Sequence, residues 1–302
     1  MQIIKPVTVT NAILTSSTVP ETDYAEWNAA STYAVGDKVI VIGVTHKIFE
    51  SLTAGNINQN PVGGDGTQWL TLGATNRWRA FDQKIADQVV QQDSINYVFG
   101  NYNSNVTSLA LFNLLGISAN VTVTDTTAGE VYNTTISLID NRNIVDWFTY
   151  FFEDQVQKET AQFIDIPPYR NAAISVTVTA NTGEDAKLGQ IVFGYLTDIG
   201  ATTYGTSISI EDFSRKETDA FGNFIVVERA FSQLADFDVQ FETRNARRIQ
   251  RTLAELRAVP VVYIGSSDTA YGTTIYGFYR RFDLTLETPS LSFGAIEVEG
   301  LT

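Results

Sequence analysis

The sequence contains no cysteine, one histidine and one methionine in 302 residues. The absence of cysteine excludes disulfide bonds and thiolate ligands for a metal ion. With His46 as its single histidine, the chain cannot build a site from several histidines, which disfavours a histidine metal site and most histidine-based acid–base catalysis. Because the chain offers neither disulfides nor a recognisable signal peptide, we expect synthesis in a cytoplasm.

Basic residues and long apolar runs are also scarce. Lys and Arg number 20 against 34 Asp and Glu, so the formal net charge is -14. A nucleic-acid-binding protein needs a basic face for its phosphate contacts, so we expect no nucleic-acid partner. No apolar run approaches the roughly 18 residues that cross a bilayer, so we expect no membrane insertion.

The common catalytic patterns are missing as well. No nucleophile-elbow, phosphate-loop or dinucleotide-binding motif occurs. Three adjacent carboxylate pairs exist, but neighbours in a strand point to opposite faces, which disfavours a glycosidase pair: these are Glu153-Asp154, Glu184-Asp185 and Glu211-Asp212. The run Gly63–Gly66 holds one carboxylate, far short of a calcium site. We therefore expect no enzyme, no cofactor and no metal.

What the chain does have is the composition of a mainly β protein. Hydrophobic residues make up 44% and charged residues 18%, which is typical of a globular chain, and Thr, Ser, Asn, Gly, Val and aromatic residues are plentiful. We divide it into an extended N-terminal arm (1–20), a small aromatic-cored β module (21–75), a jelly-roll-like β-sandwich (76–200) and a β-rich C-terminal domain with one amphipathic helix (201–302).

The arm and the module differ in pattern. Residues 1–20 alternate weakly and end at Pro20, which fits either an arm that pairs with a neighbouring subunit or a loosely ordered terminus. The module shows two short strands, over 38–42 and 46–51, and then a turn-rich loop over 54–67.

The middle segment, 76–200, alternates in short runs at the spacing of a β-sandwich. The stretch Val145–Phe152 is apolar on both faces, so we expect a covered central strand there. The other expected strands are 94–99, 106–115, 120–124, 131–139, 160–164, 173–179 and 190–196.

The C-terminal segment contains one change of period. Residues 243–257 place Ala246, Ile249, Leu253 and Leu256 on one stripe, which predicts an amphipathic helix that ends before Pro260. The expected strands around it are 206–211, 224–230, 237–242, 261–265, 274–282, 284–287 and 295–301.

This helix also carries a concentration of arginine. Arg244, Arg247 and Arg251 share one face. Arginine pairs well with carboxylates, so the face suits contact with an acidic neighbouring subunit. An ordinary solvated helix face is the alternative, and the residues alone leave both open.

The module has an aromatic signature. Its spaced residues are Trp27, Tyr33, Gly36, Asp37, Val39, Phe49, Pro61 and Trp69. The pattern resembles the small carbohydrate-binding modules attached to chitinases and cellulases, although that family often has a Tyr in the strand that here ends at Phe49. The resemblance implies that Trp27, Tyr33 and Trp69 stack on a sugar. From the residues alone, the same three side chains could instead form the core of an undersized fold.

A second resemblance concerns the whole layout. The module runs into Thr75-Asn-Arg-Trp and Phe81-Asp82, a β-sandwich follows, and the stretch 212–222 precedes the helix. This order resembles structural proteins of tailed bacteriophages, including distal-tail, baseplate and appendage-anchoring components. It implies a virion protein of the tail, synthesised in the host cytoplasm, with other tail proteins and symmetric copies of itself as partners. The alternative is a receptor-recognition protein that binds a host-surface glycan.

Overall fold

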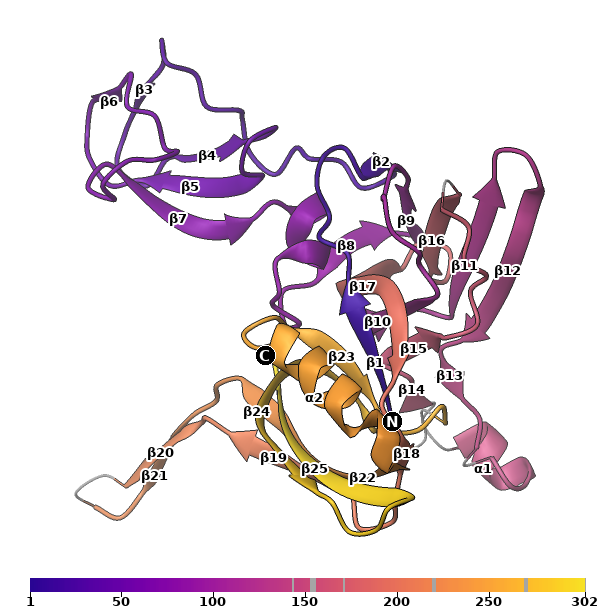
Figure 1. The fold of residues 1–302 in the computed structure, drawn as a ribbon. Coiled ribbons are helices and arrows are strands. Elements are labelled where there is room, and N and C mark those ends of the chain that lie inside the picture. Colours follow the sequence, from indigo (N-terminus) through magenta and orange to yellow (C-terminus); the bar gives the residue numbers. More distant parts are fainter. Residues whose placement is uncertain (143, 153–155, 171, 219–220, 269–270, 302) are drawn as a thin grey trace.

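The computed structural model describes residues 1–302 except 143, 153–155, 171, 219–220, 269–270 and 302. Strands hold 50% of the residues and helices 9%, which confirms the expected mainly β class. Figure 1 shows a small module at one end, two packed sheets in the middle, and a strongly curled sheet around a helix.

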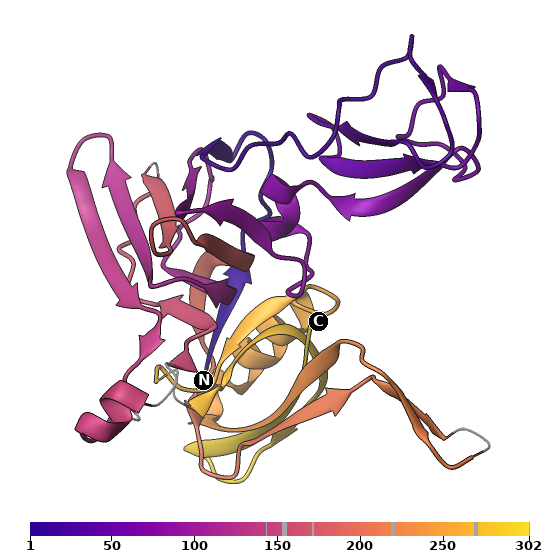
Figure 2. The ribbon, with the colours of Figure 1, turned by 180° about the vertical axis from the view of Figure 1, so that it is seen from behind.

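The N-terminal module is built from short strands. A three-stranded sheet has the order β4-β5-β7, and β3 pairs with β6. The bounds are β3 (Thr32–Tyr33), β4 (Lys38–Val41), β5 (Lys47–Ser51), β6 (Asn56–Ile57) and β7 (Trp69–Ala74). The module stands away from the rest of the molecule in both views (Figures 1 and 2).

A five-stranded antiparallel sheet forms one layer of a sandwich, in the order β12-β11-β16-β9-β2. Two of its strands, at residues 94–99 and 173–179, coincide with the prediction. The bounds are β2 (Leu14–Ser17), β9 (Ser94–Phe99), β11 (Ser118–Asp125), β12 (Gly129–Ser137) and β16 (Ala173–Thr179).

An 11-stranded sheet forms the other layer and continues into the C-terminal half. Its main path is β15-β10-β17-β1-β23-β24-β25-β22-β18, with β8 paired to β17 and β19 paired to β22. The bounds are β1 (Gln2–Pro6), β8 (Val89–Gln92), β10 (Ser108–Leu115), β15 (Thr160–Phe163), β17 (Asp185–Asp198), β18 (Ala201–Thr202), β19 (Ser207–Asp212), β22 (Phe231–Glu242), β23 (Val261–Ile264), β24 (Thr274–Thr285) and β25 (Leu291–Gly300). Because this sheet crosses residue 200, the two expected domains on either side share one sheet.

The remaining elements are short. The pairs β13 (Ile139–Asp140) with β14 (Val156–Gln157) and β20 (Arg215–Thr218) with β21 (Phe224–Val227) are separate two-stranded ribbons. The helical segments are η1 (Asn76–Phe81), α1 (Trp147–Phe152), η2 (Thr243–Asn245) and α2 (Ala246–Glu255).

The core follows this layering. The inner face of the five-stranded sheet, including Tyr97 and Phe99, packs on Leu111 and Phe193 of the large sheet. A second cluster joins the curled half of that sheet to Ile249 and other residues of α2. A third cluster covers the opposite face of the large sheet. Successive residues of β1 point to opposite faces, so Ile3 belongs to the second cluster and Ile4 to the third.

The structure corrects the prediction for the first residues of the arm. Residues 2–6 form β1, which lies antiparallel between β17 and β23 of the same chain. Ile3 and Ile4 are fully buried. A Cβ on Gly194 would lie 1.8 Å from the carbonyl oxygen of Lys5, so the two strands approach closely. Because residues 2–4 are paired on both edges and residues 5–6 on one, β1 is a strand inside this chain's own sheet and not a free arm that extends to a neighbouring subunit.

The prediction for Val145–Phe152 is also wrong. The segment contains α1 in place of a covered strand, and none of the residues of α1 is buried. The carboxylate of Asp146 accepts a hydrogen bond from the backbone N–H of Thr149 at 2.8 Å, which caps the first turn of a helix. An apolar run without period fits a covered strand and a short helix equally well, so the pattern could not choose between them.

The helix predicted over 243–257 is present as η2 followed by α2. Ile249, Leu253 and Leu256 are buried on the expected stripe, and Ala246 is partly buried. The hydroxyl of Tyr279 donates to the carbonyl oxygen of Leu253 at 3.0 Å, which ties the helix to β24.

Candidate interaction surfaces

The module brings Trp27, Tyr33 and Trp69 together in one small core with Val39 and Phe49. The rings of Tyr33 and Trp69 meet edge to face, with centroids 5.2 Å apart. Trp69 is 6% exposed, and its indole N–H donates to the carbonyl oxygen of Gln59 at 2.9 Å. Trp69 therefore supports the fold, and Trp27 and Tyr33 pack against the same core while remaining partly exposed.

The exposed large hydrophobic side chains of the module are mainly aliphatic. Leu70 and Leu72 of β7 are exposed, as are Val35 and Val44. Tyr24 is the one aromatic residue of the module among the exposed large hydrophobics, and the ammonium of Lys38 lies 5.8 Å from its ring centroid. A sugar-binding face needs a broader aromatic platform than this.

His46 lies where the module joins the sandwich. Its imidazole hydrogen-bonds Glu21 through Nδ1 at 2.8 Å and Asn11 through Nε2 at 2.6 Å, and it stacks on Trp78 with centroids 4.1 Å apart. The hydroxyl of Thr75 donates to the same Glu21 carboxylate at 2.8 Å. The lone histidine thus links the module to the residues that lead into the sandwich.

The arginines predicted to share a face are all exposed, with Arg244 in η2 and Arg247 and Arg251 in α2. Arg244 donates to Glu242 at 2.6 Å and Arg251 to Glu255 at 3.1 Å, and Arg247 is exposed. The side chains of Arg244 and Arg251 are 80% and 82% exposed. Ion pairs in such exposure contribute little to stability, so this face is open to a partner without being needed for the fold.

A long β ribbon projects from the C-terminal half (Figures 1 and 2). β19 pairs with β22 on the large sheet, and the same two chain segments continue outward as β20 and β21. Where the ribbon leaves the sheet, the backbone N–H of Arg229 donates to the hydroxyl of Ser214 at 3.1 Å. The outer hairpin, β20 with β21, has no buried residue among those described.

The two strands of this hairpin differ in chemistry. β20 carries the charged residues Arg215, Lys216 and Glu217, whereas β21 reads Phe-Ile-Val-Val without a charge. The four side chains of β21 are between 49% and 78% exposed. The sequence predicts the strand, but it gives no signal that none of the described residues covers it.

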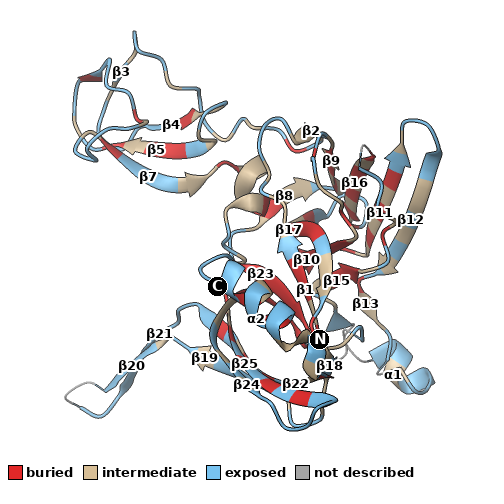
Figure 3. Cartoon of the chain, in the orientation of Figure 1, coloured by how far each residue is buried: buried red, intermediate tan, exposed pale blue. Residues whose placement is uncertain are grey.

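α1 forms a second projection, on the side of the molecule opposite the hairpin (Figure 3). Its aromatic residues are 59–78% exposed, and they are Trp147, Phe148, Tyr150, Phe151 and Phe152. The rings touch mainly one another, as in the stacked pair of Trp147 and Phe151. Soluble monomers seldom expose so contiguous an apolar surface.

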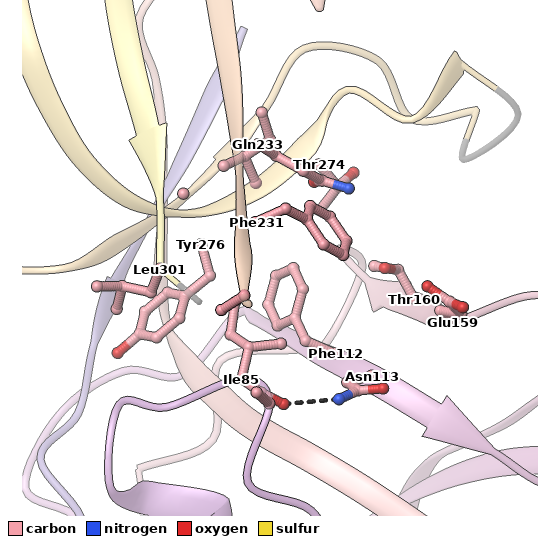
Figure 4. A pocket seen from close by; sticks show the side chains of 14 residues that line it. Ile85, Phe112, Asn113, Glu159, Thr160, Phe231, Gln233, Thr274, Tyr276 and Leu301 are labelled. Atoms are coloured by element: carbon pink, nitrogen blue, oxygen red, sulfur yellow. Dashed lines mark hydrogen bonds between the residues drawn. The ribbon is translucent and has the colours of Figure 1, made fainter. Parts of the chain in front are cut away.

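A pocket of about 280 Å³ lies on the large sheet near the base of the hairpin (Figure 4). The rings of Phe112 and Tyr276 stack in it with centroids 5.8 Å apart. Burial raises the pKa of Tyr276 to about 12, so the phenol stays neutral. Glu159 is the one charged residue of the lining, which suits an apolar group better than acid–base chemistry.

The other polar candidates do not form a centre. Among the described residues, no group of three or more His, Cys, Asp or Glu side chains could hold a metal ion. The carboxylate of Asp212 accepts hydrogen bonds from Ser214 and Lys216, and these contacts lower its pKa. The pair Glu153-Asp154 lies outside the described residues. None of the described helices is long and apolar enough to cross a membrane.

Comparison with known proteins adds no relative. No family model matches this chain, and no curated protein matches it significantly.

Proposed function

We propose that the chain is a structural component of a tailed-phage virion tail, at the tail tip, in the baseplate or as a fibre-anchoring adaptor. It acts through protein–protein interfaces and turns over no substrate. The observation that carries the proposal is the pair of apolar projections, α1 and the β20–β21 hairpin. Surfaces of this kind are typical of proteins whose final environment is an assembly.

The way in which the module is attached supports the same proposal. An adaptor has to hold its parts in fixed relation, and here Glu21, His46 and Trp78 connect the module to the sandwich through hydrogen bonds and ring stacking. The exposed aliphatic side chains of the module, such as Leu70 and Leu72, could contribute to docking a further tail component.

Recognition of a host glycan receives less support. Of the three aromatic side chains of the carbohydrate-binding signature, Trp69 is a core residue that is 6% exposed, and Trp27 and Tyr33 are partly buried against the same core. We therefore keep the structural role as the proposed function.

The proposal is tested on purified particles of a phage that encodes this chain. Mass spectrometry should find the protein at a fixed stoichiometry, and cryo-electron microscopy should place it in the tail. Its absence from infectious particles would contradict the proposal. Binding of the free protein to host cells that is lost in Tyr24→Ala, while the thermal midpoint is unchanged, would favour the glycan-binding alternative.

A further inference from the structure

The exposed aromatic surface of α1 is large enough to be one side of a specific interface. Each aromatic side chain can bury about 150–250 Å². With five of them 59–78% exposed, roughly 500–900 Å² of aromatic surface is available to a partner. A standard protein–protein interface buries about 800 Å² per partner. α1 itself carries no charged residue, so covering it leaves no charge without a partner on this helix.

The hairpin needs a cover for a different reason. An isolated two-stranded hairpin is at best marginally stable in water. The outer edge of β21 has no strand beside it among the described residues, and its sequence, Phe-Ile-Val-Val, is apolar on both faces. Exposed apolar edges of this kind pair readily with other chains. The hairpin therefore gains stability when an apolar surface packs on β21.

The positions of the two surfaces indicate how both can be covered at once. α1 and the hairpin lie at opposite sides of the molecule, and the two views in Figures 1 and 2 agree on this. A symmetric contact of α1 with α1 would leave the hairpin bare. A head-to-tail contact uses one kind of interface to cover both surfaces, and its repetition closes a ring or extends a filament.

We propose that a second copy of this chain covers the hairpin, with the aromatic side chains of its α1 packed against β21. The inference deepens the proposed function and rests on it, because it names the partner as the chain itself and the contact as head to tail. A face-to-face dimer and a contact with a different protein are the competing outcomes of the test.

The decisive experiment mixes two variants, each of which lacks one of the surfaces. The first carries Trp147→Ser with Phe151→Ser in α1, and the second carries Phe224→Asp with Ile225→Asp in β21. Native mass spectrometry and light scattering should show dimers and larger species for the unaltered protein and monomers for each variant alone. An equimolar mixture should give a one-to-one dimer and nothing larger, because each copy keeps one working surface.

Other results of the mixing experiment would overturn the inference. A hairpin variant that still dimerises by itself would indicate a face-to-face contact through α1. An unaltered protein that stays monomeric at about 100 µM, where interfaces of this size normally associate, would exclude self-association. Circular dichroism and the thermal midpoint establish that each variant folds.

Disulfide trapping provides a readout that keeps most of the apolar surface. Because the chain has no cysteine of its own, single substitutions are unambiguous. Copies with Phe148→Cys mixed with copies with Val226→Cys should form a mixed disulfide under mild oxidation at least tenfold faster than either forms a homodimer. A dominant Phe148→Cys homodimer would contradict the head-to-tail contact.

Failure of this inference can be told apart from failure of the proposed function. A monomeric protein that is nevertheless found in purified virions would leave the tail assignment standing and direct the search to another tail protein. Head-to-tail assembly by a protein that is absent from virions would contradict the tail assignment alone.

Discussion

Trp69 provides much of the apolar area in a module that has few aliphatic side chains to bury. It packs with Val39 and Phe49 and is 6% exposed. We predict that Trp69→Ala lowers the stability of the module by about 3–5 kcal/mol, the usual cost of removing a large buried side chain. A unit of this size has little stability to spare, so amides of β4, β5 and β7 should lose protection in hydrogen exchange.

The adjacent Leu70 is the matched control because it is 48% exposed on the same strand. Leu70→Ala should change stability by no more than about 0.5 kcal/mol. Unchanged protection in Trp69→Ala would contradict a core role and return the indole to consideration as a binding face.

Asp82 makes the stability of the sandwich depend on pH. Burial raises the pKa of its carboxyl to about 6, and Oδ2 has no hydrogen-bond partner. The folded-state pKa lies above that of the unfolded chain, so the favourable contribution is present below about pH 4 and is lost as the pH rises through 6. We predict that Asp82→Asn removes this fall and raises stability at pH 7 by on the order of 1 kcal/mol.

Urea denaturation at intervals between pH 4 and pH 7 measures this effect. The amide keeps an oxygen that can accept from the backbone N–H of Lys84, as Oδ1 of Asp82 does at 3.0 Å. Asp87→Asn, at an exposed carboxylate in the same loop, should retain most of the pH dependence, because the charge of Asp87 raises the pKa of Asp82 less than burial does. Parallel curves for Asp82→Asn and the unaltered protein would refute the assignment.

At the scale of elements, α2 has one stripe of side chains buried in the core and another exposed to solvent. Leu253 is 1% exposed in the core, whereas Arg251 is 82% exposed and pairs with Glu255. We predict that Leu253→Ala costs about 2–5 kcal/mol and that Arg251→Ala costs less than about 1 kcal/mol. Thermal denaturation measures both, and equal losses would show that the arginine face supports the fold.

The same helix shows what a periodic pattern can predict. The stripe through Ile249 and Leu253 and the alternation in residues 94–99 and 173–179 both arise because one face is buried and the other is not. α1 lacks such a contrast, so its pattern could not distinguish a covered strand from an exposed helix. Whether α1 is exposed depends on whether distant parts of the chain pack against it. The local sequence of α1 does not contain that information.

At the scale of the whole molecule, β1 shows the same limit more clearly. Residues 2–6 pair with residues 194–198, and residues 2–4 also pair with residues 262–264, both far along the chain. Weak alternation near a terminus is compatible with an arm, and only the completed sheet reveals a gap that β1 fills. The aromatic set of the module could be predicted as one cluster, because its members lie within about fifty residues. The exposure of the two projecting surfaces, α1 and the β20–β21 hairpin, could not be predicted, because it depends on how the rest of the chain folds around them.

The direction of the module relative to the sandwich depends on contacts at one junction. His46 has φ +50, hydrogen-bonds Glu21 and Asn11, and stacks on Trp78. His46→Asn preserves a residue that accepts positive φ but removes the ring from Trp78. We predict that the variant keeps both folded parts while the module samples a wider range of orientations.

Small-angle X-ray scattering should show this as a broader distance distribution with a larger maximum dimension, and protease should cut faster in residues 18–26. Lys47→Ala, at the exposed next residue, which begins β5, is the control and should leave both readouts unchanged. The backbone hydrogen bonds of Asn76 to Asp23 remain in the variant, so the module should loosen without detaching. A scattering curve identical to that of the unaltered protein would show that the remaining contacts fix the module and that the histidine is dispensable for its orientation.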